Sequence, residues 1–209
     1  MWHRNKMGIK AAAGGSAWTN ILLNNVVGSS AVITSETQIA HSTYGGTAVW
    51  NGATYMEDVQ FTYQQISGDF DIACHIANLD AAWNVRDANA GFLATEKIDG
   101  TKAIGMMHCL WWNEVSDVWR NYTYRYRTVE GANPTTADAN SDGWLWLRMA
   151  RVTNDFILYR STNGSTWTTI ATVAIVATSS MYVGVVSNAR DSDFSEISFD
   201  PVFDTITGF

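Results

Sequence analysis

The chain has 209 residues, of which 46% are hydrophobic, and a formal net charge of −7. This apolar share can build a sizeable core, which excludes a chain that is disordered throughout. The acidic balance disfavours nucleic acid and anionic membranes as main partners, since both repel negative charge. No apolar run approaches the ~18 residues of a membrane-spanning helix, so we predict no transmembrane segment.

Residues 1–19 differ in character from the rest of the chain. They are rich in Gly and Ala, and their basic residues precede Glu36, the first acidic residue. A lysine and a pair of glycines break the apolar run, so we expect no secretory signal. We predict a basic N-terminal arm over 1–19, which anchors the chain to other protein subunits, and one domain over 20–209. The arm residues expected to make this contact are Trp2, Arg4, Lys6, Lys10 and Trp18.

Short segments of alternating polarity follow the arm. In EDVQFTYQQ (57–65) and DFDIACHI (69–76), apolar and polar residues alternate with the period of half-buried strands. We predict a hairpin turn at ISG (66–68) between these two strands, and a long polar loop at 128–142. Further strands are predicted at 89–97, 101–112, 117–127, 143–152, 155–161, 166–175, 180–187 and 193–200.

The segments between these strands contain residues that are typical of tight turns. Asp99-Gly100 and Asn163-Gly164 are typical of tight hairpins in which φ must be positive. Thr153-Asn154-Asp155 indicates another turn. About ten strands at regular spacing, without helical crossovers, indicate an all-β antiparallel sandwich.

Several stretches of the chain resemble a known family. They are YQQISGDFDI (63–72), AGFL (90–93), YRYRT (124–128) and the segment 146–168, which contains WLRM and STNGSTWT. In this order they resemble a bacterial branch of the concanavalin A-like lectin/glucanase superfamily, over roughly residues 45–200. The resemblance implies a two-sheet jelly-roll β-sandwich. It implies little about function, because this fold hosts lectins, glycosidases, lyases and structural modules.

The stretch QQISGDFDIACHI (64–76) concentrates reactive side chains. Alternation places Cys74 inward and Asp69, Asp71 and His75 outward. Cys74 and His75 therefore point to opposite faces and cannot act together as nucleophile and base. We interpret Cys74 and Cys109 as two buried free thiols, while a disulfide between them stays an open alternative.

The sequence gives only weak evidence of a catalytic site or a metal site. Superfamily members that hydrolyse β-glucans carry a Glu-x-Asp-x-x-Glu strand, and the nearest match here, from Asp191 to Glu196, lacks the first glutamate. We therefore predict no catalytic residues and no enzyme activity. Neither zinc-like spacing nor a D-x-D-x-D-G loop occurs, so we predict no metal and no cofactor. Possible calcium ligands are Asp69, Asp71, Asp99, Asp191 and Asp193.

Aromatic residues gather in 111–126. A ring beside hydrogen-bonding groups is what a sugar site needs, and the predicted strand 117–127 alternates between a tyrosine face and a face with Trp, Asn and Arg. The alternative is that the tyrosines are core and the arginines face solvent. We interpret Trp144 and Trp146 as buried, and Trp167 as a staple of its hairpin. The candidate glycan-binding residues are Trp111, Trp112, Trp119, Tyr122, Tyr124 and Arg125.

Three classes of function remain. The first is a non-catalytic structural or attachment protein, present in many copies in a bacteriophage virion as a capsid decoration, head fibre or tail appendage. In this role the arm contacts other subunits, and the lectin-like sandwich is free to bind cell-surface glycans. The second class is a free carbohydrate-binding module. The third, which lacks a matching pair of carboxylates, is a glycoside hydrolase or lyase.

Overall fold

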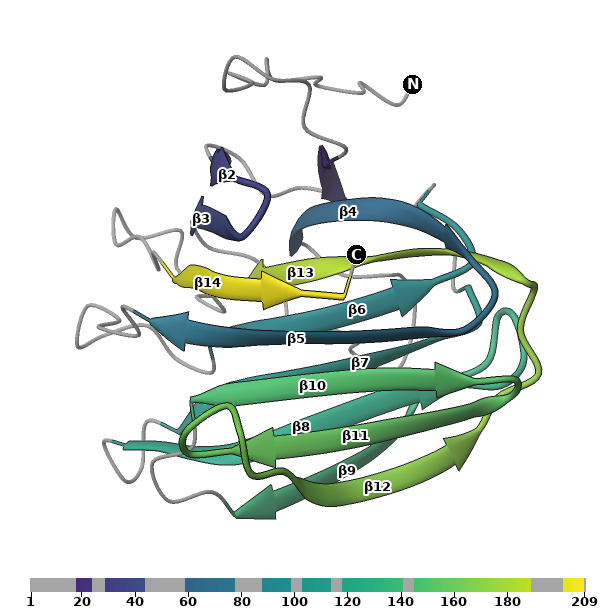
Figure 1. The fold of residues 1–209 in the computed structure, drawn as a ribbon. Helices are drawn as coiled ribbons and strands as arrows, with labels where there is room; N and C mark the ends of the chain where they lie inside the picture. The colour runs from purple at the N-terminus through teal and green to yellow at the C-terminus, as the bar shows by residue number, and fades with distance from the viewer. Residues whose placement is uncertain are drawn as a thin grey trace.

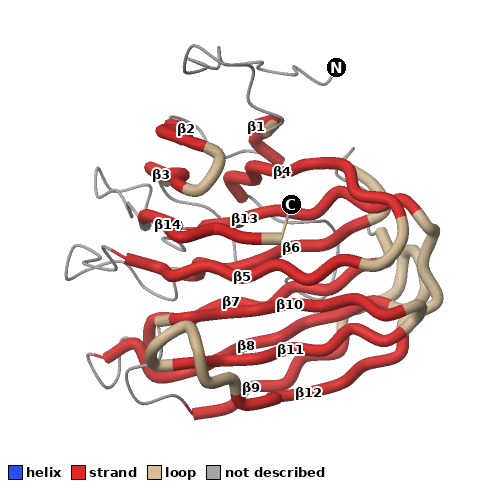
Figure 2. The backbone as a smooth tube through the Cα atoms, viewed as in Figure 1, coloured by secondary structure: helices blue, strands red, loops and turns tan. Residues whose placement is uncertain are grey.

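The computed structural model describes residues 18–23, 29–43, 59–77, 88–98, 103–113, 118–140, 145–188 and 201–208. These residues form two antiparallel sheets of seven strands each, stacked face to face (Figures 1 and 2). Sheet A has the order β1-β4-β13-β6-β7-β8-β9, and sheet B has the order β12-β11-β10-β5-β14-β3-β2. The prediction of an all-β two-sheet sandwich is confirmed. Within the described ranges, no helix is long and apolar enough to cross a membrane.

Most of the predicted segments coincide with strands of similar bounds, but the sequence analysis does not predict the strands at 19–23, 30–35, 38–42 and 202–207. The strands of sheet A are β1 (Thr19–Leu23), β4 (Val59–Ser67), β6 (Asn89–Thr95), β7 (Gly105–Asn113), β8 (Val118–Arg127), β9 (Thr135–Asn140) and β13 (Ser180–Asn188). The strands of sheet B are β2 (Ser30–Ser35), β3 (Gln38–Ser42), β5 (Phe70–Ala77), β10 (Trp146–Val152), β11 (Asp155–Ser161), β12 (Thr168–Ala174) and β14 (Val202–Thr207).

Two predictions about the strands are wrong. The turn at 66–68 does not close a hairpin, because β4 pairs with β1 and β13 in sheet A, whereas β5 pairs with β10 and β14 in sheet B. Gly68, with φ of +87°, turns the chain from one sheet to the other. The predicted polar loop at 128–142 contains β9, a polar edge strand that pairs with β8. The predicted strand at 193–200 and the turn at Asp99-Gly100 lie outside the described residues.

The main core lies between the two sheets. The inward residues of β5, namely Phe70, Ile72, Cys74 and Ile76, are at most 7% exposed and alternate with partly or fully exposed neighbours. Burying a large apolar side chain stabilises a fold by roughly 1.5–3 kcal/mol, so this alternation fixes the orientation of β5. Both cysteines are buried and free, as predicted.

The two sheets differ in their outer faces. On sheet A, residues that point away from the main core, including Phe61, Leu93, Met107 and Cys109, are at most 1% exposed and form a second apolar cluster. All seven residues of β6 are consequently buried. The outer face of sheet B instead reaches solvent, because Asp71 and Arg148 have side chains 50% and 28% exposed.

Two histidines join the sheets across the core. His41 on β3 hydrogen-bonds Ser187 Oγ through Nδ1 (2.8 Å) and Thr62 Oγ1 through Nε2 (2.9 Å). His108 on β7 hydrogen-bonds the backbone oxygen of Tyr159 through Nε2 (3.1 Å). Burial lowers the pKa of His41 to about 3 and that of His108 to about 4. Both histidines are therefore neutral in the folded protein at neutral pH.

We expect the free energy of unfolding to decrease as the pH falls from 6.5 toward 4. In that window the unfolded chain binds protons at both histidines, with pKa near 6.5, and the folded protein does not. The loss amounts to about 1 kcal/mol per pH unit for each histidine. Urea unfolding at a series of pH values measures it. His41→Gln, which can still hydrogen-bond across the core, should show a shallower slope above pH 5, and an unchanged slope would contradict the assignment.

Candidate functional site

The outer face of sheet B brings together residues that are distant in sequence. Strand register places Asp204, His75 and Trp146 side by side across β14, β5 and β10. A second row, next to the first, crosses the same strands and continues onto β11. It consists of Thr207, Ala73, Arg148 and Tyr159. We call this face the aromatic surface; its members are Asp71, Ala73, His75, Trp146, Arg148, Tyr159, Trp167, Asp204 and Thr207.

The first row is held by a ring contact and a hydrogen bond. The imidazole of His75 lies 4.9 Å from the ring of Trp146, with an angle of 35° between the planes. Its Nδ1 lies 3.0 Å from Oδ1 of Asp204, and the two side chains are 26% and 28% exposed. Trp146 itself is half-buried. These contacts hold the indole in one orientation at the protein surface.

Arg148 organises the second row. Its Nε and Nη2 donate to the two carboxylate oxygens of Asp71 at 2.6 and 2.5 Å, a bidentate pair that fixes the plane of the guanidinium. The hydrogen bond to Asp71 raises the pKa of Arg148. The guanidinium carbon also lies 4.6 Å from the ring centre of Tyr159 and 5.8 Å from that of Trp167. Asp71 thus balances the arginine charge while Arg148 positions two aromatic rings.

The turn between β11 and β12 supplies Trp167. Asn163 Oδ1 accepts hydrogen bonds from the backbone N–H groups of Ser165 and Thr166, both at 2.9 Å. Gly164 has φ of +71°, as the sequence predicts for this hairpin, and a Cβ at this position would lie 2.8 Å from the ring of Trp146. The turn therefore packs against Trp146 and carries Trp167 to Arg148. Trp167 therefore reaches Arg148 on β10, across the intervening strand β11.

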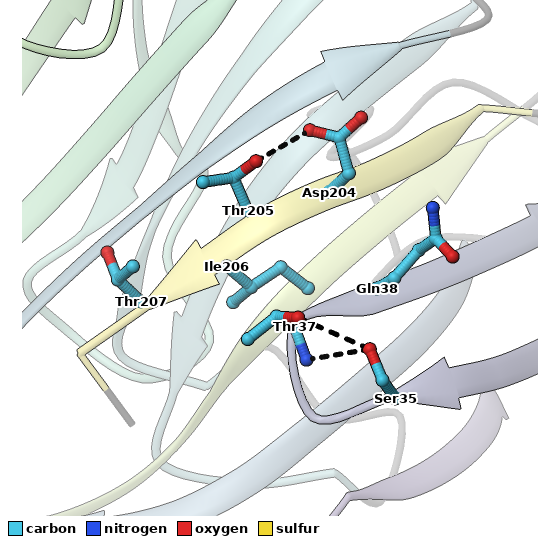
Figure 3. Close-up of a pocket in the computed structure, with 7 residues that line it drawn as sticks. All are labelled: Ser35, Thr37, Gln38, Asp204, Thr205, Ile206 and Thr207. Atoms are coloured by element: carbon cyan, nitrogen blue, oxygen red, sulfur yellow. Dashed lines mark hydrogen bonds between the residues drawn. The ribbon is translucent and has the colours of Figure 1, made fainter.

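An open pocket lies at one end of the aromatic surface (Figure 3). It has a volume of about 380 Å³ and lies between β14 and the turn that joins β2 to β3. Its lining is rich in hydroxyl groups and consists of Ser35, Thr37, Gln38, Asp204, Thr205, Ile206 and Thr207. Asp204 belongs both to the pocket and to the first row, so the two features are continuous.

This arrangement has the chemistry of a surface that binds polar, ring-shaped molecules. Half-buried aromatic rings supply apolar contact, and hydroxyl, amide and carboxylate groups beside them supply directed hydrogen bonds. The polar groups are paired within the surface, because Arg148 forms an ion pair with Asp71 and His75 forms a hydrogen bond with Asp204. Binding therefore does not require a strongly charged ligand.

The predicted glycan site lies elsewhere, on β7 and β8 of sheet A. The register pairs Trp111 with Asn121 and Trp112 with Trp119, but these side chains and that of Tyr122 lie outside the described part. Tyr124 packs against the main core, as the alternative reading of the tyrosine face predicts. Arg125 points to the opposite face, beside the buried Thr123 and Arg127. The structure therefore does not bring Tyr124 and Arg125 together.

The predicted arm lies mostly outside the described residues, which exclude Trp2, Arg4, Lys6 and Lys10. Trp18 is described, and it belongs to the sandwich: it is 3% exposed in the main core, and its Nε1 donates to the backbone oxygen of Glu36 at 3.2 Å. β1 begins at the next residue. Trp18 and Thr19, which the prediction assigns to the arm, are thus part of the described sandwich.

The acid and thiol groups considered for catalysis are separated by the fold. Cys74 lies in the main core and Cys109 in the second cluster, and burial raises the pKa of both thiols. The segment from Asp191 to Glu196 lies outside the described residues. Where the structure describes the chain, no three His, Cys, Asp or Glu side chains converge as a metal site requires. Two of the possible calcium ligands have protein partners, Asp69 the N–H of Thr153 and Asp71 the side chain of Arg148.

The sequence predicts neither Trp146 nor Asp204 as a site residue. The prediction that Trp146 is buried follows from a strand that is apolar on both faces, but Trp146 is half-buried on the outer face. The pattern of WLRM indicates the outward orientation of Trp146, because Trp146 and Arg148 alternate with the buried Leu147 and Met149. Asp204 had no comparable signal, since its contact with His75 spans 129 positions.

No family model and no curated protein matches this sequence. Solved structures do match its fold. A protein of unknown function from Saccharomyces cerevisiae is similar over 93% of this chain and 99% of its own, with a TM-score of 0.68 and 13% identity. A legume lectin-like domain from Entamoeba histolytica is similar over 87% and 89%, with a TM-score of 0.54 and 10% identity. The carbohydrate-binding module CBM66 from Bacillus subtilis is similar over 92% and 95%, with a TM-score of 0.52 and 13% identity. The chain therefore has the fold of the lectin-like, concanavalin A-like β-sandwiches.

Proposed function

We propose that this chain is a non-catalytic carbohydrate-binding module whose ligand lies on the aromatic surface of sheet B. One observation carries the proposal. Three half-buried rings, Trp146, Tyr159 and Trp167, lie on one solvent-facing sheet surface beside hydrogen-bonding groups whose positions are fixed by ring contacts and ion pairs. A sugar ring needs both elements, an apolar face and directed hydrogen bonds.

The fold supports the same class of function. Two similar structures are a lectin-like domain and a carbohydrate-binding module, both matched over most of their length. The fold alone does not assign a function, because sites are built on shared folds independently. The argument therefore depends on the aromatic surface, and the fold adds only that this scaffold is used for such sites.

Glycan screening tests the proposal. The wild-type protein is applied to immobilised neutral glycans, and each positive glycan is titrated by calorimetry. Trp167→Ala should weaken binding about threefold to tenfold, the effect of one lost aromatic contact. Arg125→Ala, on the predicted site of sheet A, is the matched control and should leave the affinity unchanged. Binding to no glycan, or loss of binding in the Arg125 variant alone, would contradict the proposal.

We propose as a second role that the module is carried on a phage particle through residues 1–17. The basic residues Arg4, Lys6 and Lys10 precede an otherwise acidic chain, which favours contact with a partner of opposite charge. Because Trp18 is part of the core, the informative truncation removes residues 1–17 and keeps Trp18. The truncated protein should keep its melting temperature and lose incorporation into particles. Normal incorporation would contradict this role.

A further inference from the structure

The pocket of Figure 3 is formed by an irregularity in β14. The register of β14 against β5 shifts between Asp204 and Thr207, and Thr205 has φ of +52°, which is uncommon for a residue with a side chain. Ile206 turns into the main core at 2% exposure, and its N–H donates to the backbone oxygen of Thr37 at 3.1 Å. Bulges of this kind re-aim side chains next to functional sites.

The bulge presents polar groups to solvent at the end of the aromatic surface. Thr205 and Thr207 are exposed on either side of the buried Ile206. Thr205 Oγ1 donates to Asp204 Oδ1 at 3.1 Å, the same oxygen that contacts His75. Across the pocket, the hydroxyls of Ser35 and Thr37 lie 3.2 Å apart (Figure 3). The pocket therefore offers a cluster of hydroxyl groups and one carboxylate.

The pocket and the aromatic rings lie on one line across the strands. From β3, which carries Gln38, the line crosses β14 and β5 to β10 and β11, which carry Trp146 and Tyr159. Neighbouring strands are about 4.8 Å apart, so the four steps span about 19 Å. A single sugar ring covers only a part of this distance. A chain of several sugar units is needed to contact both ends.

The charged residues along this path across the strands disfavour anionic sugars. Asp204 lies in the pocket, and Asp71 lies beside Arg148 and balances its charge. The whole chain carries a net charge of −7. Uronate or sulfated sugars would be repelled along this path, whereas neutral sugars can donate hydroxyl hydrogens to the carboxylate of Asp204.

We propose that the pocket is a second sugar subsite, and that the ligand is a linear neutral oligosaccharide lying across β3, β14, β5, β10 and β11. This inference rests on the proposed function and adds the length and charge of the ligand. One end of the oligosaccharide occupies the pocket, where Thr37, Gln38 and Asp204 bind its hydroxyls. The other end contacts the rings of Trp146 and Trp167.

A chain-length series tests the proposal. Cello-, xylo-, manno- and fructo-oligosaccharides, from the disaccharide to the tetrasaccharide, are titrated by calorimetry into the wild type and into a Ser35→Ala, Thr37→Val double variant, because these two residues line only the pocket. The double variant removes two hydroxyls with little change of shape, and its melting temperature checks the fold. For the wild type we expect at least fivefold tighter binding of a tetrasaccharide than of its disaccharide. In the double variant this gain should be lost, with disaccharide affinity unchanged.

The outcomes separate the two proposals. If disaccharides bind but affinity does not depend on length, or if the gain persists in the double variant, the second subsite is wrong and the proposed function stands. If no neutral oligosaccharide of any length binds, both proposals are wrong. A matched tetrasaccharide of uronates should bind at least tenfold more weakly than the neutral one, and equal binding would contradict the assignment of a neutral ligand.

Discussion

Replacing Arg151 by alanine is expected to lower the free energy of unfolding by about 3–5 kcal/mol. Arg151 is 4% exposed, and its guanidinium donates to the backbone oxygens of Thr153 (2.9 Å), Thr178 (2.8 Å) and Ala177 (3.2 Å). It also lies 5.7 Å from the ring centre of Phe156. One side chain therefore ties the β10–β11 turn to the connection between β12 and β13. Its removal leaves several carbonyl groups without their charged donor.

The matched control for this prediction is Arg148→Ala. Arg148 lies on the same strand and is ion-paired with Asp71, but its side chain is 28% exposed, and exposed pairs contribute about 0–1 kcal/mol. Urea unfolding of both variants measures the difference. If Arg151→Ala lowers the free energy of unfolding no more than Arg148→Ala does, then Arg151 does not hold the connection between β12 and β13.

Replacing Trp146 by alanine is expected to weaken carbohydrate binding by at least tenfold, the largest effect of any single change in the aromatic surface. Trp146 lies between the two ends of the surface, in contact with His75 and next to Gly164 of the turn that carries Trp167. Its removal takes away the central ring, and it also frees His75 and the turn that the ring supports. A loss of ~1.4 kcal/mol in binding corresponds to tenfold in affinity.

Two comparisons show whether this loss comes from the site. Trp146→Phe keeps an aromatic face and should retain affinity within a few-fold of the wild type. The melting temperature of Trp146→Ala, together with its near-ultraviolet circular dichroism, shows whether the sandwich stays folded. If a folded Trp146→Ala variant binds oligosaccharide as well as the wild type, the ligand does not lie on this surface.

Much of the fold is predictable from alternation, and the errors have a physical reason. Alternation shows which face of a strand is apolar, and the inward orientation of Ile72 and Cys74 follows from it. It does not show which strand is the partner. The alternating apolar residues of β4 lie in the second cluster and those of β5 lie in the main core. Both strands therefore show the pattern of a half-buried hairpin strand, although they belong to different sheets. β9 was missed because TTADAN is a polar edge strand, and such strands carry few apolar residues.

The site was harder to predict, because it depends on contacts between strands that are distant in sequence. The sequence places His75 correctly on the outer face, but its partners come from β10 and β14. Aromatic residues are densest at 111–126, but Tyr124 in this segment packs against the core. On sheet B the rings are spread over β10, β11 and the turn before β12, and only the register brings them together.

Mapping the bound oligosaccharide by nuclear magnetic resonance tests the central claim most directly. Backbone amide shifts are followed while a neutral tetrasaccharide is added to the isotope-labelled protein. We predict the largest changes at His75, Trp146, Trp167 and Asp204 on the outer face of sheet B. Changes confined to Met107, Cys109 and Arg125, on the outer face of sheet A, would contradict the account.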